Sequence, residues 1–133
     1  MKLPCEIASN SVVPAIRALL ARELLETYEM KQTEVAGLLG ITQTAVSKYT
    51  HRVRGIGLQI DRDGDVRVVV LRIAAALAKN GLDRTDLALR ICSACELIRR
   101  KRLMCKLCER ADPSIDVQQC FVCSKKAASG QSE

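Results

Sequence analysis

Six of the seven cysteines form three Cys-x-x-Cys pairs near the end of the 133-residue chain. Two thiolates three positions apart can hold one metal ion at about 2.3 Å from each sulfur, and two such pairs complete a tetrahedral site. The segment is too short for a hydrophobic core of its own, so we expect a metal to stabilise its fold. The candidate ligands are Cys92, Cys95, Cys105, Cys108, Cys120 and Cys123.

The spacing leaves the identity of the metal and the choice of ligands open. Zinc and an iron–sulfur cluster both take four thiolates, and a third pair leaves sulfur to spare for a cluster or a redox switch. Disulfides or buried thiols are the remaining alternative, although the cytosol disfavours disulfides. The first two pairs are the most compact set, but the third can replace either by loop closure. Cys5 is isolated, and we expect a buried, small apolar role for it rather than ligation.

A run of basic residues accompanies the cysteines, with no acidic residue between Glu96 and Glu109. Such a run would keep thiolates ionised and offset the charge of roughly −2 on a four-thiolate zinc site. It could also contact DNA, and a solvated helix end is the simplest expectation. The run consists of Arg99, Arg100, Lys101, Arg102 and Lys106.

The second informative segment is the run KQTEVAGLLGITQTAVSKY, from Lys31 to Tyr49. Its apolar residues have the spacing of two short helices. Gly40 fits the turn between them, because a left-handed backbone costs a residue with a side chain roughly 1 kcal/mol or more. Thr42 is then the N-cap of the second helix, which begins at Gln43. The residues expected to face inward are Val35, Ala36, Leu39, Val46 and Tyr49.

The polar residues of the second helix point away from the predicted core and can bond to base edges or phosphates. No acidic residue lies between Glu34 and Asp61, so the cations there form an unopposed positive surface. A helical hairpin with a solvated face is the alternative. The candidate DNA contacts are Thr42, Gln43, Thr44, Ser47, Lys48, Arg52 and Arg54.

The run from Met30 to Tyr49 resembles the helix-turn-helix of the Cro and phage-repressor (XRE-type) family. The resemblance implies that Gln32 contacts phosphate and that Gln43, Thr44 and Lys48 read bases. Lys31 departs from the family pattern, because it replaces the usual Ser or Thr cap. The matching residues are Met30, Gln32, Glu34, Val35, Ala36, Leu39, Gly40, Ile41, Val46, Ser47, Lys48 and Tyr49.

The wider chain is similar to archaeal predicted regulators of the same type that carry a C-terminal cysteine-rich module. This similarity is carried by Pro4-Cys5-Glu6, by the Pro-Ala-Ile-Arg helix start at Pro14, and by the paired cysteines. Together with the motif, it implies a double-stranded-DNA-binding transcriptional regulator. Such readers usually act as dimers, and the cysteine-rich module is the candidate for the homodimer contact and for a redox or metal sensor.

The elements that position these groups are expected to be helical. The range 11–28 predicts one amphipathic helix capped by Ser11, and the range 66–80 predicts another. A further helix opens at Asp83, with Asp86 in a capping-box-like arrangement. The range 55–64 predicts a loop, with a short strand as the alternative. The expected apolar stripes contain Ile16, Leu19, Leu20 and Leu24, and later Leu87, Ile91, Ala94 and Ile98.

Composition agrees with a small domain and an appendage. The net charge of +6 favours a polyanionic partner, and with two Tyr, one Phe and no Trp, stacking on single strands is disfavoured. No segment approaches the roughly 18 apolar residues of a membrane span, and no signal-peptide pattern is visible, so we expect a cytoplasmic protein.

The sequence therefore predicts a mostly α fold, with a helix-turn-helix bundle of about five helices and a small C-terminal metal module. The predicted divisions are a DNA-binding domain (1–82), a helix with the cysteine-rich module (83–123) and a disordered tail (124–133). The predicted function is transcription regulation without enzyme activity, with zinc or an iron–sulfur cluster as cofactor. The alternatives are a zinc-stabilised protein-interaction adaptor and a thiol oxidoreductase, although no βαβ pattern surrounds any cysteine pair.

Overall fold

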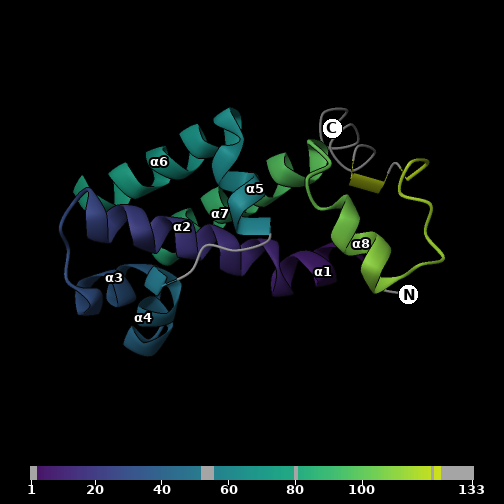
Figure 1. Ribbon diagram of the computed structural model, residues 1–133. Helices are drawn as coiled ribbons and strands as arrows, with labels where there is room; N and C mark the ends of the chain where they lie inside the picture. Colours follow the sequence, from purple (N-terminus) through teal and green to yellow (C-terminus); the bar gives the residue numbers. More distant parts are fainter. Residues whose placement is uncertain (1–2, 52–55, 80, 121, 124–133) are drawn as a thin grey trace.

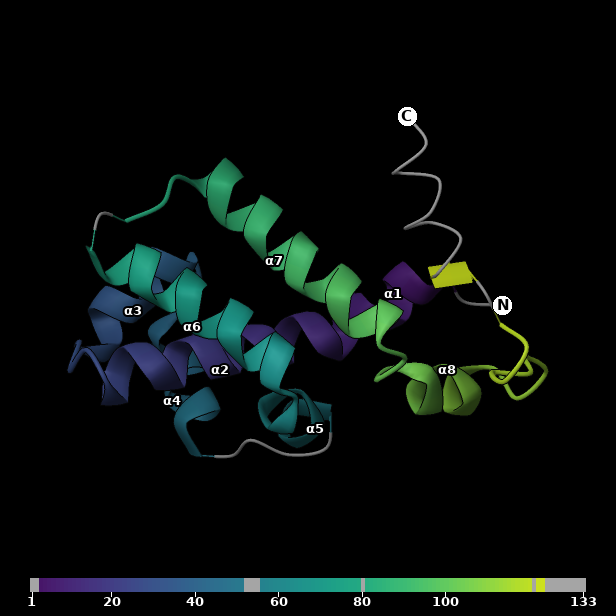
Figure 2. The same cartoon turned by 90° about the horizontal axis from the view of Figure 1, so that it is seen from above.

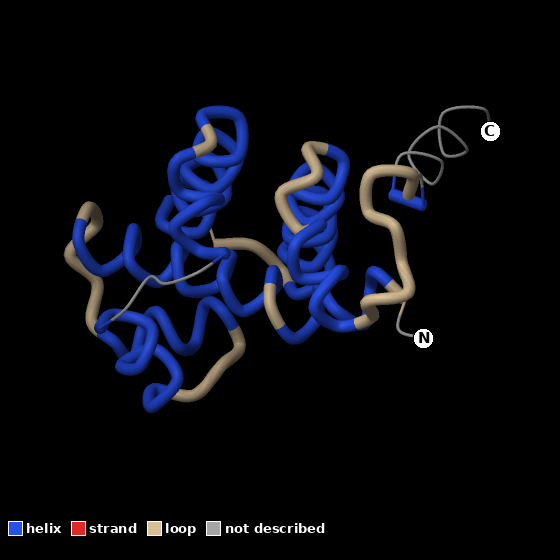
Figure 3. The backbone as a smooth tube through the Cα atoms, turned by 45° about the vertical axis from the view of Figure 1, so that its right-hand side comes forward, coloured by secondary structure: helices blue, strands red, loops and turns tan. Residues whose placement is uncertain are grey.

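The computed structural model describes residues 3–51, 56–79, 81–120 and 122–123. This part of the chain contains helices and no strand (Figure 3), which confirms the mostly α class. It holds eight helices rather than about five. The predicted tail lies outside the described residues. The helices are α1 (Pro4–Asn10), α2 (Val12–Glu26), α3 (Gln32–Leu39), α4 (Gln43–His51), α5 (Ile56–Arg62), α6 (Gly64–Lys79), α7 (Arg84–Arg100) and α8 (Cys105–Ala111).

The central element of the fold is α2, which packs against every helix from α1 to α7 (Figures 1 and 2). The predicted stripe of α2 faces the core: Ile16, Leu20 and Leu24 are completely buried and Leu19 nearly so. Burying one such side chain contributes roughly 1.5–3 kcal/mol. This stripe is therefore a major source of the apolar contacts that hold the surrounding helices.

Ser11 separates α2 from α1, a short helix that the sequence pattern does not predict. Instead of capping the start of α2, the Ser11 hydroxyl donates a hydrogen bond to the carbonyl oxygen of Ile7 at 2.6 Å. Ile7 and Ala8 are buried in the main core. The apolar side of α1 thus extends the core beyond the predicted start of the first helix.

The helices α6 and α7 pack against α2 and against each other. The start of α7 follows the prediction, because Asp83 Oδ1 accepts the backbone N–H of Asp86 at 2.8 Å. One hydrophobic cluster runs from Ile7 to Met104 and includes the buried residues of α7. Residues on both sides of the predicted boundary at 82 therefore contribute to one core.

The helix α5 corrects the prediction of a loop or short strand in this region. A seven-residue helix is weak on its own, so contacts with other elements must stabilise it. Ile60 is completely buried in the core. Asp61 Oδ1 lies 2.9 Å from Arg22 Nη2 of α2 in an ion pair and accepts a hydrogen bond from Arg67 Nη1 of α6 at 2.8 Å. Because Arg22 and Arg67 both lie outside the range 55–64, the periodicity of that range does not reveal these contacts.

The arrangement places the two predicted functional regions at opposite ends of the molecule. In both Figure 1 and Figure 2, α3 and α4 lie at one end of α2, and α8 lies near α1 at the other. Contacts between α1 and α8 attach the cysteine-bearing helix to the rest of the fold. Within the described residues, no helix has both the length and the apolar character needed to cross a bilayer.

Candidate nucleic-acid interface and cysteine pockets

The turn between α3 and α4 has the geometry that the sequence predicts. Gly40 adopts a left-handed backbone with φ 68° and ψ 33°. The backbone N–H of Ile41 donates to the carbonyl oxygen of Ala36 at 3.0 Å, which closes the end of α3. Thr42 Oγ1 accepts the backbone N–H of Ala45 at 3.1 Å, so Thr42 caps α4. At the start of α3, Lys31 provides no side-chain cap.

The apolar and polar residues of these two helices separate as predicted. Val35, Ala36, Leu39 and Val46 are buried, and Tyr49 packs partly buried against the core. This packing fixes which side of α4 faces outward, because residues on the opposite side of a helix cannot reach the core.

The outward side of α4 is polar. Thr42, Gln43, Thr44 and Lys48 are exposed, whereas Gln32 and Ser47 are half-buried. The structure brings five of these six together, because all except Thr42 line one open hollow in the surface. None of the described residues that line this hollow is acidic. The predicted contacts Arg52 and Arg54 lie outside the described residues.

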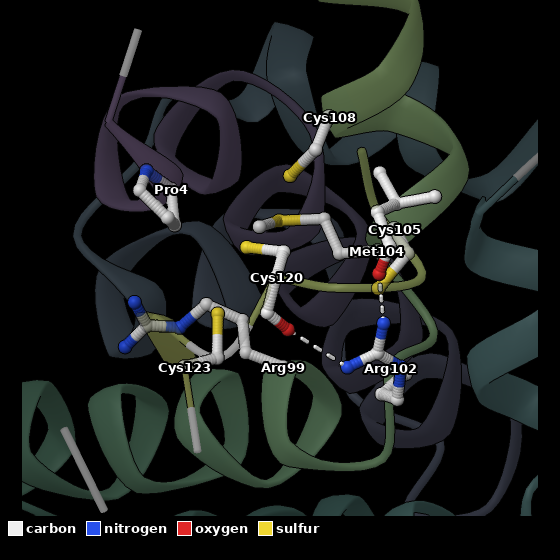
Figure 4. Close-up of a pocket in the computed structure, with 9 residues that line it drawn as sticks. Pro4, Arg99, Arg102, Met104, Cys105, Cys108, Cys120 and Cys123 are labelled. Atoms are coloured by element: carbon white, nitrogen blue, oxygen red, sulfur yellow. Dashed lines mark hydrogen bonds between the residues drawn. The ribbon is translucent and has the colours of Figure 1, made fainter. Parts of the chain in front are cut away.

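The seven cysteines, all present as thiols, are divided between two pockets at the other end of the molecule. One is a cavity of about 30 Å³ that contains the second and third Cys-x-x-Cys pairs, namely Cys105, Cys108, Cys120 and Cys123 (Figure 4). The neighbouring pocket contains the first pair, Cys92 and Cys95, together with Cys5. The third pair therefore joins the second pair and not the first.

The four cysteines of this pocket come from α8 and from the segment that follows it. Cys105 and Cys108 lie one helical turn apart on α8, and Cys120 and Cys123 return to the same cavity (Figure 4). A cavity of about 30 Å³ can hold a water-sized occupant. Across the described part of the chain, however, no three acidic, histidine or cysteine groups converge closely enough to coordinate an ion. Burial raises the pKa of the Cys108 and Cys123 thiols, which favours their protonated form in this arrangement.

Arg102, just after the end of α7, binds the segment between the second and third cysteine pairs. Its backbone is left-handed, with φ 61°. Its guanidinium donates to the carbonyl oxygen of Cys120 at 3.0 Å (Figure 4) and also to the carbonyl oxygen of Val117. A left-handed backbone is unfavourable for a residue with a side chain. These two hydrogen bonds therefore help to hold a strained residue in place.

Arg99 lies in the wall that the two cysteine pockets share. Its side chain is buried, with 8% of the residue exposed, and Nη1 donates to Cys5 Sγ at 3.3 Å. Among the described residues, Nε has no hydrogen-bond partner. Burial opposes the charge of Arg99, but the nearby sulfurs of Cys95 and Cys5 outweigh it and raise the pKa of the guanidinium. Arg99 therefore stays a cation.

The position of Cys5 corrects the expected buried, apolar role. Cys5 is exposed on α1, and its sulfur meets Arg99 of α7. The two residues are 94 positions apart, so no local pattern could have revealed this contact. Cys5 thus shares a pocket with Cys92 and Cys95, although the spacing of the cysteines in the sequence gives no sign of it.

The basic run that we expected to form a solvated helix end is largely engaged in structure. Arg99 is buried, Arg102 binds two carbonyl oxygens, and Lys101 forms two ion pairs. Lys101 Nζ lies 2.8 Å from Asp63 Oδ1 and 2.6 Å from Asp65 Oδ2. Asp63 Oδ1 also accepts the Val66 N–H at 3.1 Å, so Lys101 binds the capping residue of α6.

Comparison of the chain with protein-family models, with curated proteins and with solved structures found no match. Its function is therefore inferred from the two sites themselves.

Proposed function

We propose that the protein is a sequence-specific regulator that binds double-stranded DNA through α4. The observation that carries this proposal is the polar hollow formed by residues of α3 and α4. An exposed helix with a polar side fits the major groove, which is wide enough to admit it. The interface lies at the end of the molecule away from the cysteine pockets (Figure 1). DNA could therefore approach α4 without displacing them.

The residues in the hollow divide into two roles. Gln43, Thr44 and Lys48 are exposed on α4 and can bond to base edges, and Lys48 can also bind a phosphate. Gln32, at the first position of α3, is the candidate for a phosphate contact that fixes the register. Thr42 supports them through its cap on α4, which holds the first turn of the reading helix in place. The resemblance to XRE-type repressors implies the backbone role for Gln32 and the groove for Gln43, Thr44 and Lys48.

The test is a binding measurement on the full chain with duplexes selected from a random pool. Gln43→Ala and Lys48→Ala should each weaken binding to the selected duplex by about 1–3 kcal/mol, or roughly 5- to 150-fold. Gln119→Ala and Lys79→Ala are matched controls, because both residues are exposed and lie outside the hollow. If selection yields no preferred sequence, or if all four variants bind equally, the proposal fails. A protein adaptor or an oxidoreductase would give that result.

We further propose that Cys105, Cys108, Cys120 and Cys123 bind zinc, with an iron–sulfur cluster as the alternative that a cavity of about 30 Å³ fits less well. The support is that four thiols from two Cys-x-x-Cys pairs line one small cavity. Arg99, a buried cation with an unpartnered Nε among the described residues, lines the same cavity. A metal bound by four thiolates carries net negative charge and offers sulfur acceptors to such a donor. When bound, zinc would supply a structural cross-link, and an iron–sulfur cluster would add one-electron redox chemistry.

Metal analysis and a visible spectrum of anaerobically purified full-length protein test this proposal. Broad visible absorbance indicates iron–sulfur, whereas a colourless protein with bound zinc indicates a structural site. Cys108→Ser and Cys120→Ser should lose the metal, and Cys92→Ser, from the other pocket, should keep it. Equal loss in all three variants, or no metal in the wild-type protein, would contradict the assignment.

A sensor role would link the two sites, and it makes a separate prediction. Operator affinity should differ between the metal-loaded, metal-free and oxidised forms of the full chain. The homodimer predicted from the motif provides the link, because the separation of two α4 helices must match about 34 Å, one turn of DNA. Equal affinity in all three forms would leave a DNA reader with a structural metal and no sensor function.

A further inference from the structure

The pocket between α1 and α7 contains sulfur atoms that the proposed metal site does not use. Cys5 of α1 and Cys92 and Cys95 of α7 line this pocket, whose volume is about 220 Å³. Cys5 and Cys92 are exposed, whereas Cys95 is buried. A small molecule from solvent can therefore reach the sulfur of Cys5, and a shielded second thiol lies in the same pocket.

Arg99 gives this pocket its electrostatic character. Its Nη1 donates to Cys5 Sγ at 3.3 Å. Cys95 lies four positions before Arg99 on α7, so the two residues share one side of the helix. The guanidinium is buried, and its Nε has no partner among the described residues. Cysteines that react with oxidants occupy this kind of electropositive, partly exposed environment.

The same features argue against a second metal site in this pocket. This pocket holds three sulfurs rather than the four of a closed thiolate site, and Arg99 Nη1 already donates a hydrogen bond to one of them, Cys5 Sγ. Oxidation of the thiols is therefore the chemistry that fits the pocket better.

We propose that Cys5 is a peroxide-reactive thiol and that Cys95 is its resolving partner. In the first step, Cys5 Sγ attacks one oxygen of hydrogen peroxide, the O–O bond breaks, an S–O bond forms, and one water leaves with the thiol proton. In the second step, Cys95 Sγ attacks Cys5 Sγ, the S–O bond breaks, an S–S bond forms, and a second water leaves. Two thiols thus lose two electrons to one peroxide molecule.

The product would be a covalent link between α1 and α7. In the reduced protein α1 contacts α2 and α8, and it reaches α7 through the hydrogen bond between Arg99 and Cys5. A Cys5–Cys95 disulfide would fix the first helix to the same helix that carries Arg99. This proposal goes beyond the proposed function, because it requires neither DNA nor bound metal.

Peptide mapping after mild oxidation tests the pair directly. Anaerobically purified full-length protein is treated with one equivalent of hydrogen peroxide, blocked with N-ethylmaleimide and analysed by tandem mass spectrometry. The expected product is a Cys5–Cys95 disulfide in the wild-type protein and in the matched control Cys92→Ser. In Cys95→Ser, a dimedone adduct should accumulate on Cys5. If Cys5 stays reduced while other cysteines are oxidised, or if its adduct is equally abundant with Cys95 present, the proposal is wrong.

The alkylation rates of Cys5 and Cys92 in the wild-type protein test the proposal without any variant. In the wild-type protein, Cys5 should be alkylated by iodoacetamide about tenfold faster than Cys92, the other exposed cysteine of the pocket, as expected for a sulfur with a charged hydrogen-bond donor. Arg99→Met should remove most of that difference, and Arg99→Lys should keep part of it. Equal rates for Cys5 and Cys92 in the wild-type protein would overturn the proposed role of Arg99.

Discussion

The guanidinium of Arg84 occupies the space that a side chain on Gly40 would need. Arg84 is the first residue of α7, and Gly40 forms the turn between α3 and α4. The contact also places a positive charge at the C-terminal end of α3, where the helix dipole favours a cation. The first residue of α7 thus covers the turn that precedes the proposed reading helix.

Gly40→Ala should destabilise the protein by about 1–2 kcal/mol, because Ala disfavours the left-handed backbone; the Arg84 guanidinium, at the end of a flexible exposed side chain, can move aside for the new Cβ. Gly37→Ala is a matched control in the same helix. A Cβ on Gly37 would have no neighbour within 4 Å, and Ala is the better helix former, so this variant should gain up to about 1 kcal/mol. Urea unfolding measures both values, and equal midpoints for the two variants would contradict the role assigned to the turn.

Asp63→Asn should make the stability of the fold less sensitive to acid. The hydrogen bond from Lys101 lowers the pKa of Asp63, so the carboxylate stabilises the folded state at pH values above the ordinary Asp range. This stabilisation is lost as the pH falls through the lowered pKa. Asparagine keeps an oxygen that can cap α6 at Val66, so the change removes mainly the charge. The urea midpoint of the variant should be lower at pH 7 and approach the wild-type value in acid.

Asp65→Asn is the control for this measurement, because Asp65 also pairs with Lys101 but its side chain is 77% exposed, against 17% for Asp63. Solvent screens an exposed pair, so Asp65→Asn should change the midpoint less. A larger effect for Asp65 than for Asp63 would show that Lys101 does not act through the capping residue.

Arg102→Ala should release the segment between the second and third cysteine pairs, because it removes the hydrogen bonds to Val117 and Cys120. Amide hydrogen exchange at residues 112–120 should become faster, and retention of the proposed metal should weaken. Arg102→Gly removes the same hydrogen bonds but tolerates the left-handed backbone, so it should be about 1 kcal/mol more stable than Arg102→Ala. Unchanged exchange in both variants would rule out the anchoring role.

Lys48→Ala should make the affinity for DNA less dependent on salt. If Lys48 neutralises one phosphate, its loss should reduce the slope of log K against log salt by about 0.9. Lys79→Ala, at the end of α6, should leave the slope unchanged. Titrations of duplex DNA at several salt concentrations measure this slope, and identical slopes for Lys48→Ala and the wild-type protein would place Lys48 away from the phosphates.

The parts of the fold that sequence patterns predict well are those held by local interactions. Val35 and Leu39 lie four positions apart on one side of α3, Gly40 ends that helix, and Thr42 caps the next. Each of these signals involves residues within a few positions of one another. The start of α7 at Asp83 is predictable for the same reason.

The parts that the patterns miss depend on contacts between distant residues. The helix α5 is held by Asp61, whose partner Arg22 lies on another helix. The contact between Arg99 and Cys5 joins residues 94 positions apart. The grouping of the cysteine pairs depends on how the segment after α8 folds back, and spacing contains no information about that path.

Arg99 also makes the two groups of sulfur atoms mutually dependent. A single guanidinium lines both pockets, so each group draws on the same positive charge. Negative charge on sulfur in one pocket weakens the attraction of Arg99 for negative charge on sulfur in the other pocket. The two pockets therefore compete for Arg99 even when every helix keeps its position. The order in which the thiols of the two pockets ionise therefore depends on both pockets together.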